Sequence, residues 1–165
     1  MAELSAQQQL QQQLVALAPQ LHAGGRDIAD LRRLSGGASQ ETWSFDLRLD
    51  DGSALPLILR RAPAGSAQRA EGNATLATQA VLLGLVAAAG VPAPAVPWVL
   101  QPAQAMGEGF FMQRIAGETL GRRIVTEPAL ADARGRLARQ CGQALARIHR
   151  IAPATLPPLR RAPPA

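Results

Sequence analysis

The chain has 165 residues, of which 47% are hydrophobic, so it is long enough and apolar enough to fold around its own core rather than remain disordered. The formal net charge is +5, and all 17 basic residues are arginine. Because these arginines are scattered and are not interleaved with aromatic residues, which make up 3% of the sequence, the composition argues against a nucleic-acid-binding surface.

The number of cysteines and the hydropathy of the sequence indicate the cellular compartment of the protein. The single cysteine, Cys141, excludes an intramolecular disulfide and fits a reducing compartment. It lies on the apolar side of a predicted helix, so we expect it to be buried. No apolar run is long enough to cross a bilayer, and the first residues lack the basic start and apolar segment of a signal peptide. We therefore expect a soluble cytoplasmic protein without a membrane partner.

The first predicted element is a helix over residues 4–21. Its leucines recur near one helical face, the glutamines between them suit the water-facing side, and Ser5 can serve as the N-cap. Gly24 and Gly25 end this helix. Residues 28–34 then predict a short strand, which runs into a glycine-rich loop.

Two more strands are predicted to form a hairpin. Over residues 42–49, polar side chains alternate with apolar ones that include Trp43 and Phe45, which is the period of a half-buried strand, and we expect both aromatic residues in the core. The turn signal at residues 50–52, Asp-Asp-Gly, leads to a returning strand over residues 55–60. Such a tight connection indicates antiparallel pairing rather than a doubly wound parallel sheet.

The rest of the chain predicts more helices and two further strands. A helix begins at the capping residue Asn73 and ends at Gly90. The remaining predicted elements are strands over residues 96–100 and 110–115, a short helix over residues 119–125, a long helix over residues 130–148 and a loose proline-rich tail. The fold class is therefore α+β, with a five-stranded antiparallel sheet and a helix packed on it.

The loop at residues 35–39, Ser-Gly-Gly-Ala-Ser, admits two interpretations. Glycines allow backbone N–H groups to approach phosphate oxygens closely, and the serines add hydroxyl donors. Glycine-rich turns between strands are also common, and the sequence has neither a Walker lysine pattern nor a G-x-G-x-x-G motif. The context favours a phosphate site, because a basic residue, Arg60, lies at the end of the next strand but one, as in the small lobe of a protein-kinase-like fold.

Five ordered segments carry a specific resemblance. They are LSGGASQETWSF, LILRRAP, AAAGVPAPAV, FFMQRIAGETL and ALARIHRI, and together they resemble the aminoglycoside phosphotransferase (APH)-like phosphotransferase family over about residues 31–151. The resemblance implies a protein-kinase-like fold, of which the chain holds the N-terminal lobe and the first large-lobe helix. The implied boundaries are an N-terminal helix at residues 1–25, the small lobe at 26–116, helices that open the large lobe at 117–151, and the tail at 152–165.

The same resemblance implies where a nucleotide would bind. Arg60 stands where the family carries the Lys or Arg that contacts the α and β phosphates, and an arginine can supply that charge. Gln79 takes the place of the glutamate that pairs with this basic residue, so it can hydrogen-bond Arg60 but cannot neutralise it. The other implied nucleotide-binding residues are the phosphate-facing loop Ser35, Gly36, Gly37, Ala38 and Ser39, and the hinge residues Gln113, Arg114 and Ile115, whose backbone would hold adenine.

Neither a catalytic residue nor a metal ligand is predicted in this sequence. In the family, the catalytic Asp, an Asn and the metal-binding Asp follow the helix that ends here at His149, yet no Asp or Glu follows Asp132. The resemblance implies ATP as the cofactor, with Mg²⁺ and an unknown small-molecule acceptor for the complete enzyme. We therefore expect the N-terminal, nucleotide-binding portion of an ATP-dependent small-molecule phosphotransferase, cut short by truncation or a frameshift and inactive alone.

Two alternatives remain at this stage. The chain could be a non-catalytic binding or regulatory module that pairs with a separate large lobe or another partner chain through its exposed helices. It could also be an arginine-rich anion or nucleic-acid binder, which a steep salt dependence without competition from nucleotides would identify.

Overall fold

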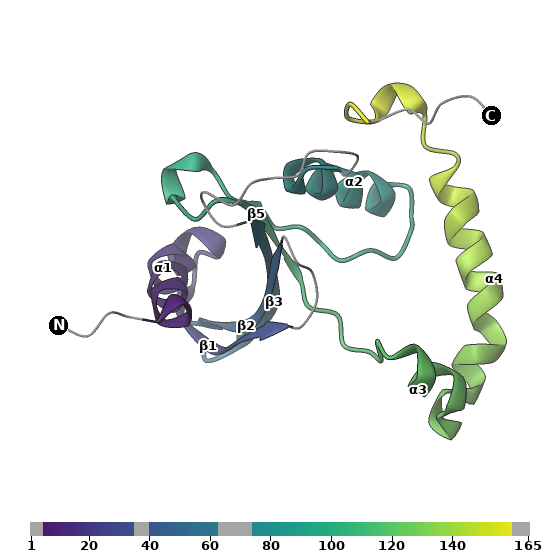
Figure 1. Cartoon of the computed structure of the whole chain (residues 1–165), viewed down its shortest axis with the longest axis horizontal. Helices are drawn as coiled ribbons and strands as arrows, with labels where there is room; N and C mark the ends of the chain where they lie inside the picture. The colour runs from purple at the N-terminus through teal and green to yellow at the C-terminus, as the bar shows by residue number, and fades with distance from the viewer. Residues whose placement is uncertain (1–4, 35–39, 63–73, 160–165) are drawn as a thin grey trace. The chain divides into compact units, whose positions relative to one another are not determined.

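The structure is a computed structural model that describes residues 5–34, 40–62 and 74–159 (Figure 1). The chain divides into two compact units. The first contains Met1–Ala80 and Ala95–Arg114, and the second contains Val81–Pro94 and Ile115–Ala165. The first unit holds the sheet, and the second holds the C-terminal helices.

Helix α1, Ala6–Leu21, begins at a complete capping box. Ser5 Oγ accepts a hydrogen bond from the Gln8 backbone N–H at 3.2 Å, and the Gln8 side chain accepts one from the Ser5 backbone N–H at 2.8 Å. The predicted helix and its N-cap are therefore confirmed. The helix ends as predicted before Gly25, where any Cβ would collide with the Ala18 carbonyl, so only glycine allows the chain to turn back along α1.

The sheet has five strands in the order β1-β2-β3-β5-β4, and every neighbouring pair is antiparallel. This confirms the predicted α+β class and the small-lobe architecture. The fourth strand is shorter than predicted, with only two residues, because Pro97 directly before it has no N–H to donate to a neighbouring strand. The strands are β1 Gly25–Leu34, β2 Glu41–Leu49, β3 Ala54–Ala62, β4 Trp98–Val99 and β5 Glu108–Gln113.

The β2–β3 hairpin turns where the sequence predicts. Gly52 has a φ of +82°, a left-handed conformation that glycine adopts without strain. The Asp51 carboxylate accepts hydrogen bonds from the Ser53 backbone N–H at 2.9 Å and from the Ser53 hydroxyl at 2.6 Å. These local bonds fix the turn and, with it, the register of the two strands.

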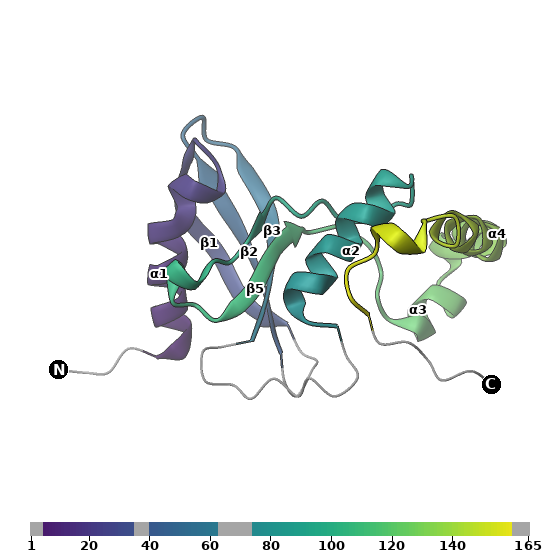
Figure 2. The same cartoon turned by 90° about the horizontal axis from the view of Figure 1, so that it is seen from above.

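One face of the sheet packs against α1 to form the core of the first unit (Figures 1 and 2). Trp43 and Phe45 are 4% and 0% exposed, which confirms their predicted place in the core. The ring of Phe45 meets that of Phe111 edge to face, with centroids 6.1 Å apart. The core residues are Leu10, Leu14, Leu17, Ala18, Ile28, Leu31, Trp43, Phe45, Leu47, Leu57, Leu59, Leu100, Met106 and Phe111.

Helix α2, Leu76–Ala88, starts later than predicted. Asn73 lies outside the described residues, and the cap is Thr75, whose hydroxyl accepts a hydrogen bond from the Thr78 backbone N–H at 3.1 Å. The Glu108 carboxylate of β5 accepts a hydrogen bond from the Ala77 backbone N–H at 2.9 Å. A carboxylate at the positive end of the helix dipole is favourable, so this contact fixes the start of α2 to the sheet.

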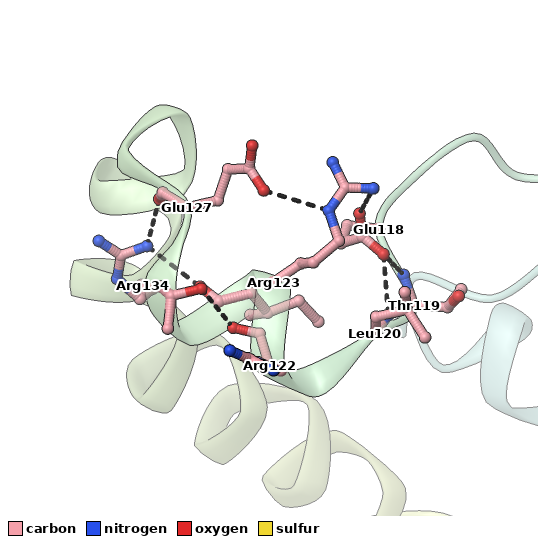
Figure 3. A network of polar contacts seen from close by, with 9 residues as sticks. Glu118, Thr119, Leu120, Arg122, Arg123, Glu127 and Arg134 are labelled. Carbon is pink, nitrogen blue, oxygen red and sulfur yellow. Dashed lines mark hydrogen bonds and ion pairs between the residues drawn. The ribbon is translucent and has the colours of Figure 1, made fainter.

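The second unit contains α3, Gly121–Thr126, and α4, Ala131–Ile148, close to the predicted helices. Arg123 forms ion pairs with Glu118 at 2.8 Å and Glu127 at 3.1 Å (Figure 3). Arg134 of α4 donates hydrogen bonds to the carbonyls of Ile124 at 3.1 Å and Glu127 at 2.6 Å. These bonds join α3 to α4.

Helix α4 has no buried residue among those that the structure describes. Its apolar side chains Leu137, Leu145 and Ile148 are 45%, 52% and 40% exposed. Cys141 lies on the same side and is exposed, so the prediction that it is buried is wrong. The periodicity correctly placed Cys141 on the apolar side of α4, a helix in which no described residue is buried.

Across the described ranges, no helix combines the length and apolar character needed to cross a membrane.

Candidate functional site

The sheet face opposite α1 carries Arg60. Side chains alternate along a strand, and since Leu57 and Leu59 point into the core with α1, Ile58 and Arg60 point to the other face. The register places Arg60 beside Thr42 of β2 and Phe110 of β5. Ile58 lies between Ser44 and Met112 in the same way. On this face, Arg60 therefore lies near the C-terminal end of β3, far from the β2–β3 turn, with the apolar side chains of Ile58 and Phe110 next to it.

Arg60 has two partners on this face. Its Nη2 donates a hydrogen bond to the Gln40 side-chain oxygen at 2.9 Å, and its guanidinium carbon lies 5.9 Å from the centre of the Phe110 ring. The second distance is within the range of a cation–π interaction. Both partners are neutral, so within the described residues no carboxylate offsets the charge of Arg60.

Gln79, which the resemblance pairs with Arg60, is engaged elsewhere. Its side-chain nitrogen donates to the Ala74 carbonyl at 2.9 Å, next to the start of its own helix. The structure thus brings Arg60 together with Gln40, which sequence reasoning did not single out. A signal was present, because Gln40 lies two residues before Thr42, the register neighbour of Arg60, and extended residues two apart share a face.

The loop residues Ser35, Gly36, Gly37, Ala38 and Ser39 lie outside the described residues. The strands on either side of the loop are described, and Glu41 connects them. Its carboxylate pairs with Arg33 of β1 at 3.7 Å and with Arg61 of β3 at 2.9 Å, and it accepts a hydrogen bond from the Trp43 indole N–H at 3.0 Å. Glu41 therefore ties together three strands where the loop begins and ends.

These contacts lower the pKa of Glu41 below its ordinary value of 4.5. Burial alone would raise the pKa, but the hydrogen bonds from Trp43 and Arg61 and the charges of Arg61 and Arg33 together outweigh burial. Because the folded-state pKa lies below the unfolded-state value, the stabilisation is present above pH 4.5 and is lost as the pH falls through the folded-state pKa.

We expect Glu41→Gln to flatten this acid dependence. In the wild-type chain, the free energy of unfolding should fall as the pH drops below about 4.5, whereas the variant lacks the titrating carboxyl and should lose less over the same interval. Urea unfolding at several pH values, followed by tryptophan fluorescence, measures the difference. An equal slope in both proteins would show that Glu41 has no altered pKa.

The predicted hinge begins where β5 ends. The Gln113 N–H donates to the Ala95 carbonyl at 2.8 Å, and the Arg114 N–H donates to the Pro56 carbonyl at 3.0 Å. Both amides are thus already paired within the sheet unit. In an antiparallel pair, the residue at position 56 would also donate its backbone N–H to the Arg114 carbonyl. Pro56 has no N–H, so the Arg114 carbonyl does not receive this hydrogen bond. Ile115 belongs to the second unit and is 62% exposed.

The Arg114 side chain lies across the sheet rather than projecting away from it. Its guanidinium donates to the Asp46 carboxylate at 2.7 Å and to the Ser44 hydroxyl at 3.1 Å. Ser44 is only 1% exposed, so this contact satisfies a buried polar group. Strand β3 separates β5 from β2 in the sheet, and Arg114 therefore links two strands that are not neighbours.

A cavity of about 380 Å³ lies beside this ion pair, lined by Asp30, Leu31, Arg32, Asp46 and Arg114. Asp30 has a φ of +55°, within the irregular pairing of β1 with β2. Within residues 5–34, 40–62 and 74–159, no group of three or more His, Cys, Asp or Glu side chains could hold a metal ion. The described residues alone therefore do not provide a site for the Mg²⁺ that the resemblance implies.

A comparison with known protein families shows to which family the chain belongs. The family model of the phosphotransferase enzyme family (APH) matches residues 30–165, which is most of the chain. The chain belongs to the phosphotransferase enzyme family. A comparison with curated proteins gave no match.

Membership of the phosphotransferase family confirms the resemblance found in the sequence. The match begins in β1 and includes the whole of β2 and β3, the predicted hinge, and α2 to α4, with α1 outside it. The five-stranded antiparallel sheet with its helices fits the N-terminal part of a kinase-like fold.

Proposed function

We propose that this chain is the nucleotide-binding portion of an ATP-dependent phosphotransferase that acts on a small molecule, and that it binds ATP without transferring phosphate by itself. The observation that carries the proposal is Arg60, which faces the side of the sheet opposite α1 and is paired only with neutral groups among the described residues. An arginine in this state can donate charge-assisted hydrogen bonds to phosphate oxygens.

The proposed site has three parts. Arg60 and the backbone of residues 35–39 contact the phosphates, and the half-buried side chain of Met112, next to Ile58 on the same face, lies against the adenine ring. The backbone of Gln113, Arg114 and Ile115 supplies hydrogen bonds to adenine. For Arg114, the carbonyl is the available group, because its N–H is already donated to Pro56. Gln79 donates a side-chain N–H to the Ala74 carbonyl, so Gln40 rather than Gln79 is the polar partner that we assign to Arg60.

The absence of catalysis is proposed from the sequence. Phosphoryl transfer depends on a residue that orients the nucleophile and on carboxylates that hold Mg²⁺ against the phosphates. No Asp or Glu follows Asp132 in these 165 residues. We therefore expect a chain that can hold ATP but cannot pass its γ-phosphate to an acceptor.

A second candidate function is a non-catalytic module that pairs with another chain. The observation that favours it is the apolar side of α4, where Leu137, Leu145 and Ile148 are exposed. An exposed apolar strip of this kind is typical of a surface that a partner covers. This candidate requires no nucleotide.

Isothermal titration calorimetry of the chain with ATP, adenosine and tripolyphosphate tests the proposal. We expect saturable binding of ATP and weaker binding of adenosine, with no release of ADP in a coupled assay. Binding of none of the three would favour the second candidate. Binding of tripolyphosphate and DNA with a steep salt dependence, and none of adenosine, would indicate an arginine-rich anion binder instead.

A further inference from the structure

The position of Arg60 depends on a residue outside the expected nucleotide-binding set. Gln40 directly follows the loop at residues 35–39 and comes immediately before β2. Its side-chain oxygen lies 2.9 Å from Arg60 Nη2 in a partly buried setting. The Phe110 ring lies 5.9 Å from the guanidinium carbon. These two contacts, one polar and one aromatic, define the direction of the guanidinium.

Helix α2 provides no comparable contact to the Arg60 guanidinium within the described residues. The Gln79 amide is donated to the Ala74 carbonyl, and the Glu108 carboxylate accepts a hydrogen bond from the Ala77 backbone N–H. Within the described ranges, Arg60 forms no ion pair. Among the residues that the structure describes, the polar partner of Arg60 is therefore Gln40, which follows the loop.

We infer that Gln40 is the positioning residue for Arg60, holding its guanidinium towards the phosphates of a bound nucleotide; this inference rests on the proposed function. An amide oxygen accepts one of the five guanidinium N–H groups and leaves the others for phosphate oxygens. A carboxylate in the same place, directly after the phosphate-facing loop, would add a negative charge close to the phosphates. The neutral amide of Gln40 orients Arg60 without adding that charge.

The substitutions Gln40→Ala and Gln40→Glu test the inference. Gln40→Ala should weaken ATP binding by about tenfold, the loss expected for one hydrogen bond to a charged group, and should leave adenosine binding unchanged. Gln40→Glu should weaken ATP binding at least as much, because it adds a negative charge close to the phosphates. A general loss of structure would weaken both ligands, so the two ligands separate positioning from folding.

A double-mutant cycle identifies the residue through which Gln40 acts. In an Arg60→Lys background, which keeps a cation but lacks the Nη2 donor, Gln40→Ala should cause little further loss of ATP affinity. Gln12→Ala on the exposed surface of α1 is the control and should change nothing. Circular dichroism and tryptophan fluorescence confirm that each variant is folded.

The outcomes separate the inference from the proposed function. If the wild-type chain binds neither ATP nor adenosine, both are overturned. If the wild-type chain binds ATP and Arg60→Ala removes that binding, but neither Gln40 variant changes it, the inference fails and the proposed function stands. An equal loss from Gln40→Ala in the wild-type and Arg60→Lys backgrounds also overturns the inference, because Gln40 would then act without Arg60.

Discussion

Arg60→Ala is expected to abolish the binding of ATP to this chain. The register of β3 places this guanidinium on the sheet face opposite α1, between Thr42 and Phe110. Loss of two charge-assisted hydrogen bonds to phosphate would cost about 3 kcal/mol or more, which corresponds to a loss of affinity of at least about 100-fold. Titration calorimetry with ATP measures the change.

Two further variants test whether the loss of ATP binding is specific to the Arg60 side chain. Arg60→Lys keeps a positive charge but loses the planar arrangement of donors, so we expect it to retain part of the affinity. Arg48→Ala removes an exposed arginine near the end of β2, away from Arg60, and should leave ATP binding unchanged. ATP binding that survives Arg60→Ala would mean that the phosphate site is wrongly assigned.

The elements with local sequence signals were predicted well. The N-cap at Ser5, the turn at Gly52 and the alternation around Phe45 each depend on residues within a few positions of one another, and the structure has all three. Local hydrogen bonds and side-chain periodicity decide such elements, so the sequence alone contains the needed information. The short β4 was predicted less well, because Pro97 limits its pairing.

The failures arose where partners far apart in the sequence decide the outcome. The partner of Arg60 depends on whether a glutamine 20 residues earlier or one in α2 lies within reach, and that depends on sheet register and on helix packing. The exposure of Cys141 depends on whether another element covers α4, which periodicity cannot show. The phosphate-facing loop at residues 35–39 lies outside the described residues and stays a prediction.

The sheet that carries Arg60 should depend strongly on Leu59, the residue before it. Leu59 is fully buried, and its register neighbours are Trp43 on β2 and Phe111 on β5. Leu59→Ala would leave a cavity between these two rings and should lower the free energy of unfolding by about 2–5 kcal/mol. Domains of this size have about 5–15 kcal/mol in total, so this one substitution should remove a large share of the stability.

Leu55→Ala is the matched control, because Leu55 lies on the same strand and the same face but is 36% exposed at the end of the hairpin. We expect it to cost less than about 1 kcal/mol, since little apolar surface is lost from the core. Urea unfolding followed by fluorescence suits the comparison, because Trp43 and Trp98 both lie in the first unit and report its unfolding alone. A similar loss from both variants would contradict the burial that distinguishes Leu59. A large loss from Leu59→Ala alone would show that the core beneath β3 supports the sheet face on which Arg60 lies.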